Sequence, residues 1–186
     1  MENDIEKLKF PIGKYKAILE FNFSRTIEDI KTLESFANNL RASVKGLDKT
    51  DFKKSYRKGG MNIAQIIHHY CDTHTYAFLR TKHTLLEDNP SVKMYEVSEF
   101  LTTPESNVLD VEDSLNVIEG IHAKWVSLLK TLSQDDFNKT YYHSARDKNI
   151  ILHEHVGMYA WHTKHHLVHI AMAKESIKEK GKRSKQ

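Results

Sequence analysis

Apolar side chains recur at spacings of three and four residues in four long segments, and this period constrains the fold most strongly. It matches one face of an α-helix, whereas a sheet protein would show sustained alternation of apolar and polar residues. The segments cover about residues 26–46, 62–86, 111–132 and 153–179. Four helices of roughly 20 residues that each bury one face predict an all-α fold, a four-helix bundle.

Two of the expected helices begin at recognisable caps. Thr26 with Asp29 three residues later resembles a capping box for the first helix. Asn62 is a good N-cap for the second helix, with Gln65 at its third position. The sequence Asp-Asn-Pro at residues 88–90 ends that helix, since proline cannot continue it.

The connections between these helices are long. Residues 46–60 are polar and end in a Gly-Gly pair, and residues 89–110 look irregular. An irregular stretch of that length serves a function, contacts another subunit or packs against the bundle. KTYYH and NIILH, residues 139–143 and 149–153, flank a turn-like SARDK and favour a short β-hairpin before the last helix. Such connections permit crossover topologies as well as simple up-down neighbours.

The length of 186 residues suits a single domain, residues 1–186, with one hydrophobic core. Residues 1–23 show no helical period, and we expect an extended or turning N-terminal arm around PIGKY. Residues 174–186 hold six Lys or Arg and two Glu, and we expect a basic, frayed C-terminal tail. This tail accounts for the net charge of +3, so the body lacks the basic patch expected of a nucleic-acid-binding protein.

Nothing in the sequence indicates a membrane or a secreted protein. No apolar run approaches the roughly 18 residues of a membrane span, and the acidic start MENDIEKLK is not a signal peptide. Cys71 is the single cysteine and allows no internal disulfide. We therefore expect a cytoplasmic protein.

Histidines cluster in the last predicted helix. Of the 12 histidines, four lie within eight residues of MYAWHTKHHLVHIAMAK, which begins at residue 158. His162 and His166 are one helical turn apart, so their Cβ atoms would lie roughly 5–6 Å from each other on one face, close enough to bind one metal ion. His165 and His169 have the same spacing, but on a helical wheel His166 lies nearer the apolar side than His165. This favours His162 with His166.

A catalytic metal usually has three protein ligands, so a third should come from another helix. The second helix contains HHYCDTH, residues 68–74. On the wheel His69 lies closer to the apolar side than His68, which makes it the better candidate. His74 lies closer still, but a histidine there is equally a core residue. The alternative to a metal site is a plain bundle with many surface histidines.

Three neighbours of His69 are candidates for supporting roles. Asp72 lies one turn away and is placed either to accept the second ring N–H of His69 or to remain a solvated surface charge. Tyr76 and Arg80 continue the same side of the helix, and we consider them candidates for substrate contact.

The segments GGMNIAQIIHHYCDTH, YAFLRTK, PIGKY and YAWHTKHHLVHI resemble the YfiT-like branch of the DinB/YfiT-like metalloenzymes, in the same order and spacing over nearly the whole chain. The resemblance implies a four-helix bundle that binds a divalent metal, zinc or nickel, through His69, His162 and His166. It also implies a homodimer. Departures are Met61 where tryptophan is usual and Tyr70-Cys71 where Leu-Ala is usual, and neither affects a proposed ligand.

The activity implied by the resemblance is metal-dependent hydrolysis of a small molecule, in which the metal activates water. Relatives that transfer a low-molecular-weight thiol suggest an alternative, in which a bacillithiol-type thiol is the nucleophile toward an electrophile. A non-catalytic metal-binding module is a third hypothesis. The sequence does not decide among the three.

Overall fold

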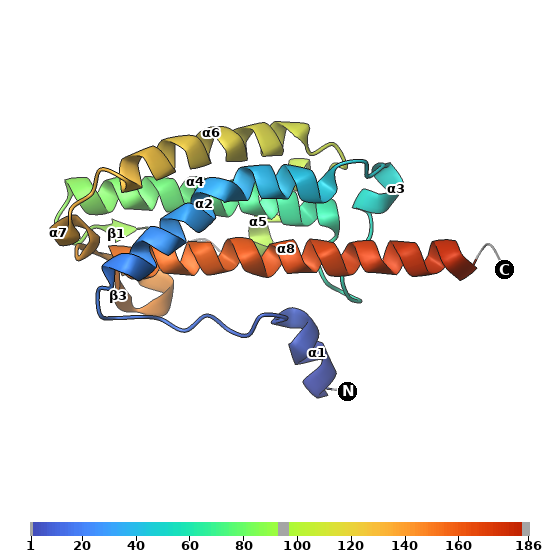
Figure 1. The fold of residues 1–186 in the computed structure, drawn as a ribbon, viewed down its shortest axis with the longest axis horizontal. Helices are drawn as coiled ribbons and strands as arrows, with labels where there is room; N and C mark the ends of the chain where they lie inside the picture. Colours follow the sequence, from blue (N-terminus) through green and yellow to red (C-terminus); the bar gives the residue numbers. More distant parts are fainter. Residues whose placement is uncertain (1, 93–96, 184–186) are drawn as a thin grey trace.

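The computed structural model describes residues 2–92 and 97–183. Its four long helices, and thus the bundle, agree with the predicted fold class (Figure 1). They are α2 (Phe23–Val44), α4 (Ile63–Leu86), α6 (Glu112–Leu129) and α8 (Leu152–Arg183). Within the described ranges no helix has the length and apolar character needed to cross a membrane.

The order of the helices around the bundle differs from their order in the chain. Helix α2 packs against α6 and α8, and α4 also packs against α6 and α8. Figure 1 shows that α2 and α8 run in one direction, whereas α4 and α6 run in the other. Since α4 and α6 are parallel neighbours, the chain between them must return the full length of a helix. This explains the long connection after α4, and of the two topologies that the sequence permits the structure has the crossover.

The connections contain short elements. The predicted hairpin is present, because β2 (Thr140–His143) and β3 (Lys148–Ile151) pair antiparallel with Thr140 opposite Ile151. A third strand, β1 (Ser91–Val92), pairs parallel to β2 inside the stretch predicted to be irregular. Two residues are too few to show a strand period, so this strand was missed. The remaining short elements are α3 (Lys49–Phe52), α5 (Val97–Phe100), η1 (Glu105–Asn107), α7 (Gln134–Phe137) and η2 (Ser144–Arg146).

Of the two predicted helix N-caps, one is confirmed and the other is wrong. The Asn62 and Gln65 capping box is present at the start of α4. The prediction for α2 is wrong, because the helix begins at Phe23 and its N-cap is Asn22, whose side chain accepts a hydrogen bond from the Arg25 N–H. Asparagine is a strong N-cap, and the Thr26 hydroxyl donates to the Asn22 carbonyl instead.

Both ends of the chain are more helical than predicted. Residues expected to form an extended arm include a helix, α1 (Glu2–Lys9), supported by the Lys9–Glu6 ion pair at 3.1 Å. Helix α8 continues through residues 174–183 of the predicted tail and so extends past the predicted helix end at about residue 179. Residues 184–186 of the predicted tail and residues 93–96 of the predicted loop lie outside the described residues.

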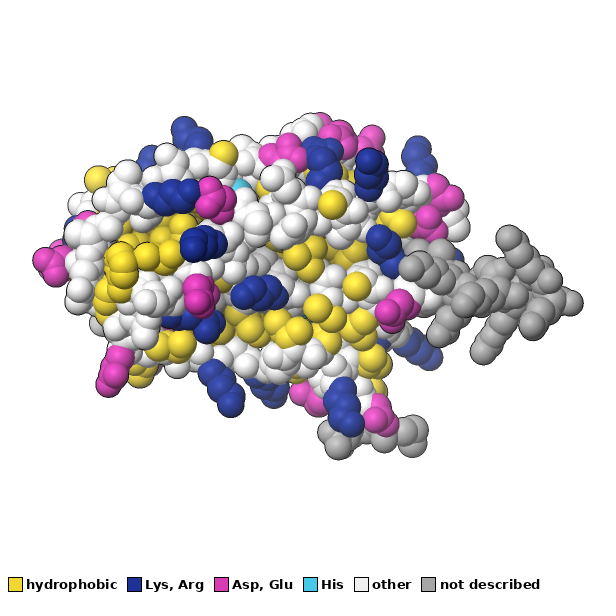
Figure 2. All heavy atoms as spheres, in the orientation of Figure 1, with side chains coloured by type: hydrophobic (Ala, Val, Ile, Leu, Met, Phe, Trp, Pro, Cys, Tyr) yellow, Lys and Arg dark blue, Asp and Glu magenta, His cyan; other side chains and the backbone are white. Residues whose placement is uncertain are grey.

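The apolar core has two parts, one toward each end of the bundle. Ile63, Ile67 and Leu115 belong to one part, and Trp125 and Val156 belong to the other. Ten of the 12 histidines are buried as well. Almost no histidine is visible on the face in Figure 2. Most histidines are therefore not at the surface, where the alternative of a plain bundle placed them.

Candidate metal centre

The three predicted ligands lie together between α4 and α8. His69 comes from α4, and His162 and His166 come from successive turns of α8, which packs against α4. The Nε2 atoms of His69 and His162 are 3.0 Å apart, and the ring centroids of His162 and His166 are 4.7 Å apart. One ring nitrogen of each residue lies within 4.8 Å of the other two. We call these three residues the α4–α8 trio.

A second group of three histidines lies on α8 alone. Ring nitrogens of His165, His166 and His169, the α8 trio, also lie within 4.8 Å of one another. His165 stacks on Trp161 with centroids 4.5 Å apart, and His169 stacks on Tyr56 at 3.8 Å. Distances alone therefore leave two candidate groups that share His166.

The α4–α8 trio consists of neutral imidazoles at pH 7. Burial lowers the pKa of His69 to about 4, and the neighbouring His165 contributes to the shift. Burial also holds the pKa of His162 and of His166 well below the usual value, and nearby histidines add to the effect. Each neutral ring offers one lone pair, and no carboxylate belongs to the group. Converging imidazole nitrogens of this kind fit a divalent ion such as zinc or nickel.

Asp72 does not make the predicted contact with His69. Among the described residues no hydrogen bond joins the two side chains. Partial burial is the main cause that raises the pKa of Asp72, and the charge of Glu105 raises it further. His68, the other histidine of the pair, is turned toward α6, where its Nδ1 lies 2.8 Å from the Ser114 hydroxyl.

Arg80 is buried among uncharged aromatic groups. Its Nη1 donates to the Tyr159 hydroxyl at 3.2 Å, but its Nε and Nη2 have no hydrogen-bond partner in the described chain. The guanidinium lies over the Tyr76 ring, 5.7 Å from the centroid. A cavity of about 280 Å³ is lined by Tyr76 and Arg80, together with Leu79, His83, Glu87 and residues 90–92. The two residues predicted to contact a substrate thus lie at one cavity.

Two histidines that support the site were not assigned to it from the sequence. His74, weighed only as a ligand or a core residue, has its Nε2 3.0 Å from the Nδ1 of His162. The Nε2 of His122, from α6, lies 2.8 Å from the Nδ1 of His74. His122 lies at helical spacing between Ile118 and Trp125, so its place on the buried face could have been predicted.

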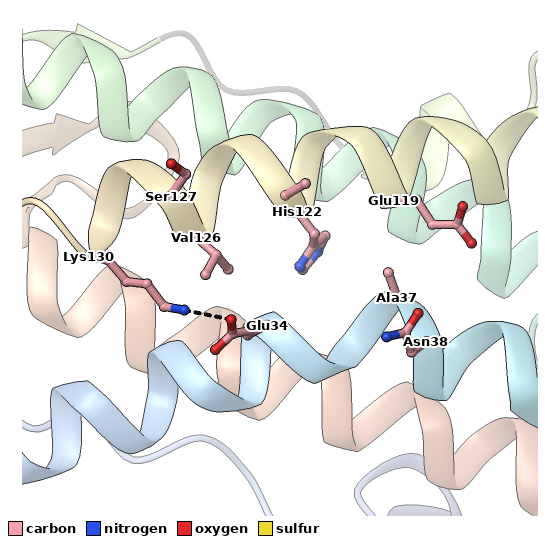
Figure 3. A pocket seen from close by; sticks show the side chains of 9 residues that line it. Glu34, Ala37, Asn38, Glu119, His122, Val126, Ser127 and Lys130 are labelled. Atoms are coloured by element: carbon pink, nitrogen blue, oxygen red, sulfur yellow. Dashed lines mark hydrogen bonds and ion pairs between the residues drawn. The ribbon is translucent and has the colours of Figure 1, made fainter.

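A groove on another side of the bundle does not reach the α4–α8 trio. It lies between α2 and α6, has a volume of about 530 Å³ and exposes charged side chains (Figure 3). The Lys130 ammonium and the Glu34 carboxylate form an ion pair across it at 2.5 Å. His122 lines the groove, whereas the trio lies at the opposite seam, between α4 and α8.

The chain is similar to proteins of three bacteria. A protein of Geobacillus kaustophilus named "Putative metal-dependent hydrolase" is 34% identical over 167 residues, which cover 90% of this chain and 94% of that protein. A protein of Oceanobacillus iheyensis with the same functional name is 37% identical, covering 87% and 93%. "Putative metal-dependent hydrolase YfiT" of Bacillus subtilis is 30% identical, covering 88% and 92%.

The fold is also similar to a solved structure. YfiT from Bacillus subtilis, described as having "an unusual four-helix bundle topology", superposes with a TM-score of 0.89 at 29% identity, covering 92% of this chain and 98% of that one. The family model described as the DinB superfamily matches residues 32–170, a range that includes His69, His162 and His166. The chain belongs to the DinB superfamily.

Proposed function

We propose that this chain is a metal-dependent hydrolase of a small molecule and that its α4–α8 trio holds a divalent ion, with zinc preferred and nickel as the alternative. The observation that supports the proposal is the convergence of three neutral imidazole nitrogens from two helices. Relatives at 30–37% identity carry the name metal-dependent hydrolase. Imidazole ligands suit zinc and nickel better than they suit magnesium or calcium.

A divalent ion held by neutral ligands keeps its full +2 charge and lowers the pKa of a bound water molecule, which supplies a nucleophile at neutral pH. The surrounding side chains fix the ligand rings. The Tyr70 ring packs edge-on against His162 and His166, with centroid distances of 5.5 and 5.6 Å. Its hydroxyl donates to the Thr163 carbonyl at 2.6 Å, which anchors α4 to α8 beside the site.

Hydrolysis is expected when the zinc-loaded protein is tested against a panel of chromogenic esters and amides. Removing the metal with a chelator should reduce the rate to that of the buffer, and zinc or nickel should restore it. His162→Ala, treated in the same way, controls for contaminating hydrolases.

Other outcomes of the same assay contradict hydrolysis. If a thiol and an electrophilic halide were consumed together while esters and amides were not hydrolysed, the activity would be that of a thiol S-transferase. Metal binding without either activity would assign a non-catalytic module. The homodimer and the cytoplasmic location stay predictions.

We propose Arg80 and Tyr76 as contacts for the substrate, at a cavity whose lining does not include the ligands of the α4–α8 trio. A buried guanidinium without a countercharge costs free energy, and a bound carboxylate or phosphate would offset this cost. Arg80 lines a cavity, and its two nitrogens that lack partners are buried. We therefore propose that the substrate carries an anionic group.

Arg80→Met is expected to abolish stabilisation by small anions. Acetate or sulfate at ten times its dissociation constant should stabilise the wild type by about 1.4 kcal/mol, measured as a rise in Tm at constant ionic strength. The variant should show no such rise while its anion-free stability is unchanged or increased, because the uncompensated charge is gone. Arg146→Met, at an exposed arginine, is the control and should respond like the wild type. An equal response in Arg80→Met would exclude an anion site at Arg80.

A further inference from the structure

A path of hydrogen bonds connects His162 to the backbone of α2. His162 Nδ1 lies 3.0 Å from His74 Nε2, and His74 Nδ1 lies 2.8 Å from His122 Nε2. His122 Nδ1 lies 2.8 Å from the Leu33 carbonyl oxygen. We call this the Leu33 path. It crosses the bundle from the α4–α8 seam to the helix that borders the groove in Figure 3.

The carbonyl at its end fixes the direction of every hydrogen bond in the Leu33 path. A carbonyl oxygen only accepts, so the proton of His122 is on Nδ1 and its Nε2 is an acceptor. His74 must then donate from Nδ1 and accept at Nε2, and His162 must donate from Nδ1. A neutral imidazole has one N–H, so the lone pair of His162 is on Nε2, the atom that faces His69.

A second path connects His166 to the N-terminal helix. His166 Nδ1 lies 3.1 Å from His169 Nδ1, and His169 Nε2 lies 3.1 Å from the carbonyl oxygen of Leu8 on α1. In this Leu8 path the carbonyl places the proton of His169 on Nε2. His169 Nδ1 then accepts from His166 Nδ1, which leaves the lone pair of His166 on Nε2.

We infer that His74, His122 and His169 are positioning residues which set His162 and His166 as Nε2 ligands. The inference concerns the trio of the proposed function and adds a reason for choosing it over the α8 trio. The single lone pair of His169 is already used to accept from His166, so His169 has none to offer a metal. The N-terminal helix α1 thus belongs to the metal centre through the Leu8 carbonyl.

Burial keeps the rings of both paths neutral. It lowers the pKa of His122 to about 4, and it lowers that of His74 and of His169 as well. His69 differs from the other two ligands. Its Nε2 faces the His162 lone pair at 3.0 Å and therefore carries the proton, which must move to Nδ1 before His69 can serve through Nε2.

Asparagine and glutamine substitutions test the inference, because an asparagine amide oxygen can occupy the place of Nδ1 and a glutamine oxygen that of Nε2. At position 74 the accepting atom is Nε2, so His74→Gln should keep zinc affinity and His74→Asn should weaken it. At position 169 the accepting atom is Nδ1, so His169→Asn should keep affinity and His169→Gln should weaken it. We expect losses of about 10-fold to 100-fold for the mismatched amides and less than about threefold for the matched ones.

Zinc dissociation constants are measured by competition with a chelator, and circular dichroism checks that each metal-free variant is folded. If His74 and His169 only filled space, the better-tolerated amide would not change from glutamine at position 74 to asparagine at position 169. Equal losses for both amides at a position, or the opposite ranking, would overturn the path through that position.

Long-range ¹⁵N–¹H NMR of the metal-free wild type supplies a test that needs no variant. His162 and His166 should each show a protonated Nδ1 and an unprotonated Nε2. Protonation at Nε2 of either ring would overturn the inference, even if zinc binds. If the wild type binds no zinc, the proposed function fails, whereas the NMR result still decides the two paths.

Discussion

Zinc affinity is expected to fall by more than about 100-fold when His69, His162 or His166 is changed to alanine. Removing a partner that only orients a ligand costs about 10-fold to 100-fold, so removing a ligand should cost more. Each substitution leaves two ligands where a stable site needs at least three. Bound metal per chain, measured after equilibrium dialysis against buffered zinc, should be near one for the wild type and near zero for the variants.

His165→Ala is the matched control for these substitutions. It removes a histidine of the α8 trio and should leave zinc binding close to that of the wild type. Because His165 stacks on Trp161, near-UV circular dichroism must show that the variant keeps its tertiary packing. Zinc lost in His165→Ala but kept in His69→Ala would move the metal from the α4–α8 trio to the α8 trio. A wild type that binds no zinc or nickel would contradict both trios.

The four long helices were predictable because the sequence features that define each helix lie within its own segment. An apolar stripe and a capping box such as Asn62 with Gln65 lie within one segment, and burying the stripe requires only some other helix. The hairpin of β2 and β3 was predictable for the same reason. The strand β1, in contrast, exists only because Ser91 and Val92 pair with Tyr142 and His143, about 50 positions away.

The same division applies to the site. His162 and His166 could be chosen because one helical turn separates them, and His69 because it lies nearer the apolar side of its helix than His68. The contact of His169 with Leu8 joins residues 161 positions apart and depends on where α1 lies. No spacing in the sequence contains that contact. The prediction of an extended or turning arm holds for residues 10–22, but it missed α1, the element that provides this contact.

Metal-free protein is expected to lose stability steeply as the pH falls from 7 to 4.5. Burial lowers the pKa of His155 to about 3 and that of His122 to about 4, against 6.5 in the unfolded chain. Between these values the unfolded chain binds more protons than the folded one, so stability is present above pH 6.5 and is lost below it. Each histidine contributes up to about 1.4 kcal/mol per pH unit, which gives a loss on the order of 5 kcal/mol for the two over this range. Urea unfolding followed by far-UV circular dichroism in EDTA measures the loss.

His155→Gln and Tyr141→Phe separate proton binding from the loss of a hydrogen bond. The Tyr141 hydroxyl lies 2.9 Å from His155 Nδ1, so both variants lose this hydrogen bond, but only His155→Gln loses the titrating ring. Its amide can still donate to the Ala77 carbonyl, as His155 Nε2 does at 3.1 Å. Tyr141→Phe should lower stability equally at every pH, whereas His155→Gln should reduce the acid loss by on the order of 2.5 kcal/mol, the share of one titrating ring among the buried histidines. Equal pH dependence in the two variants would show that His155 does not bind the proton that destabilises the fold.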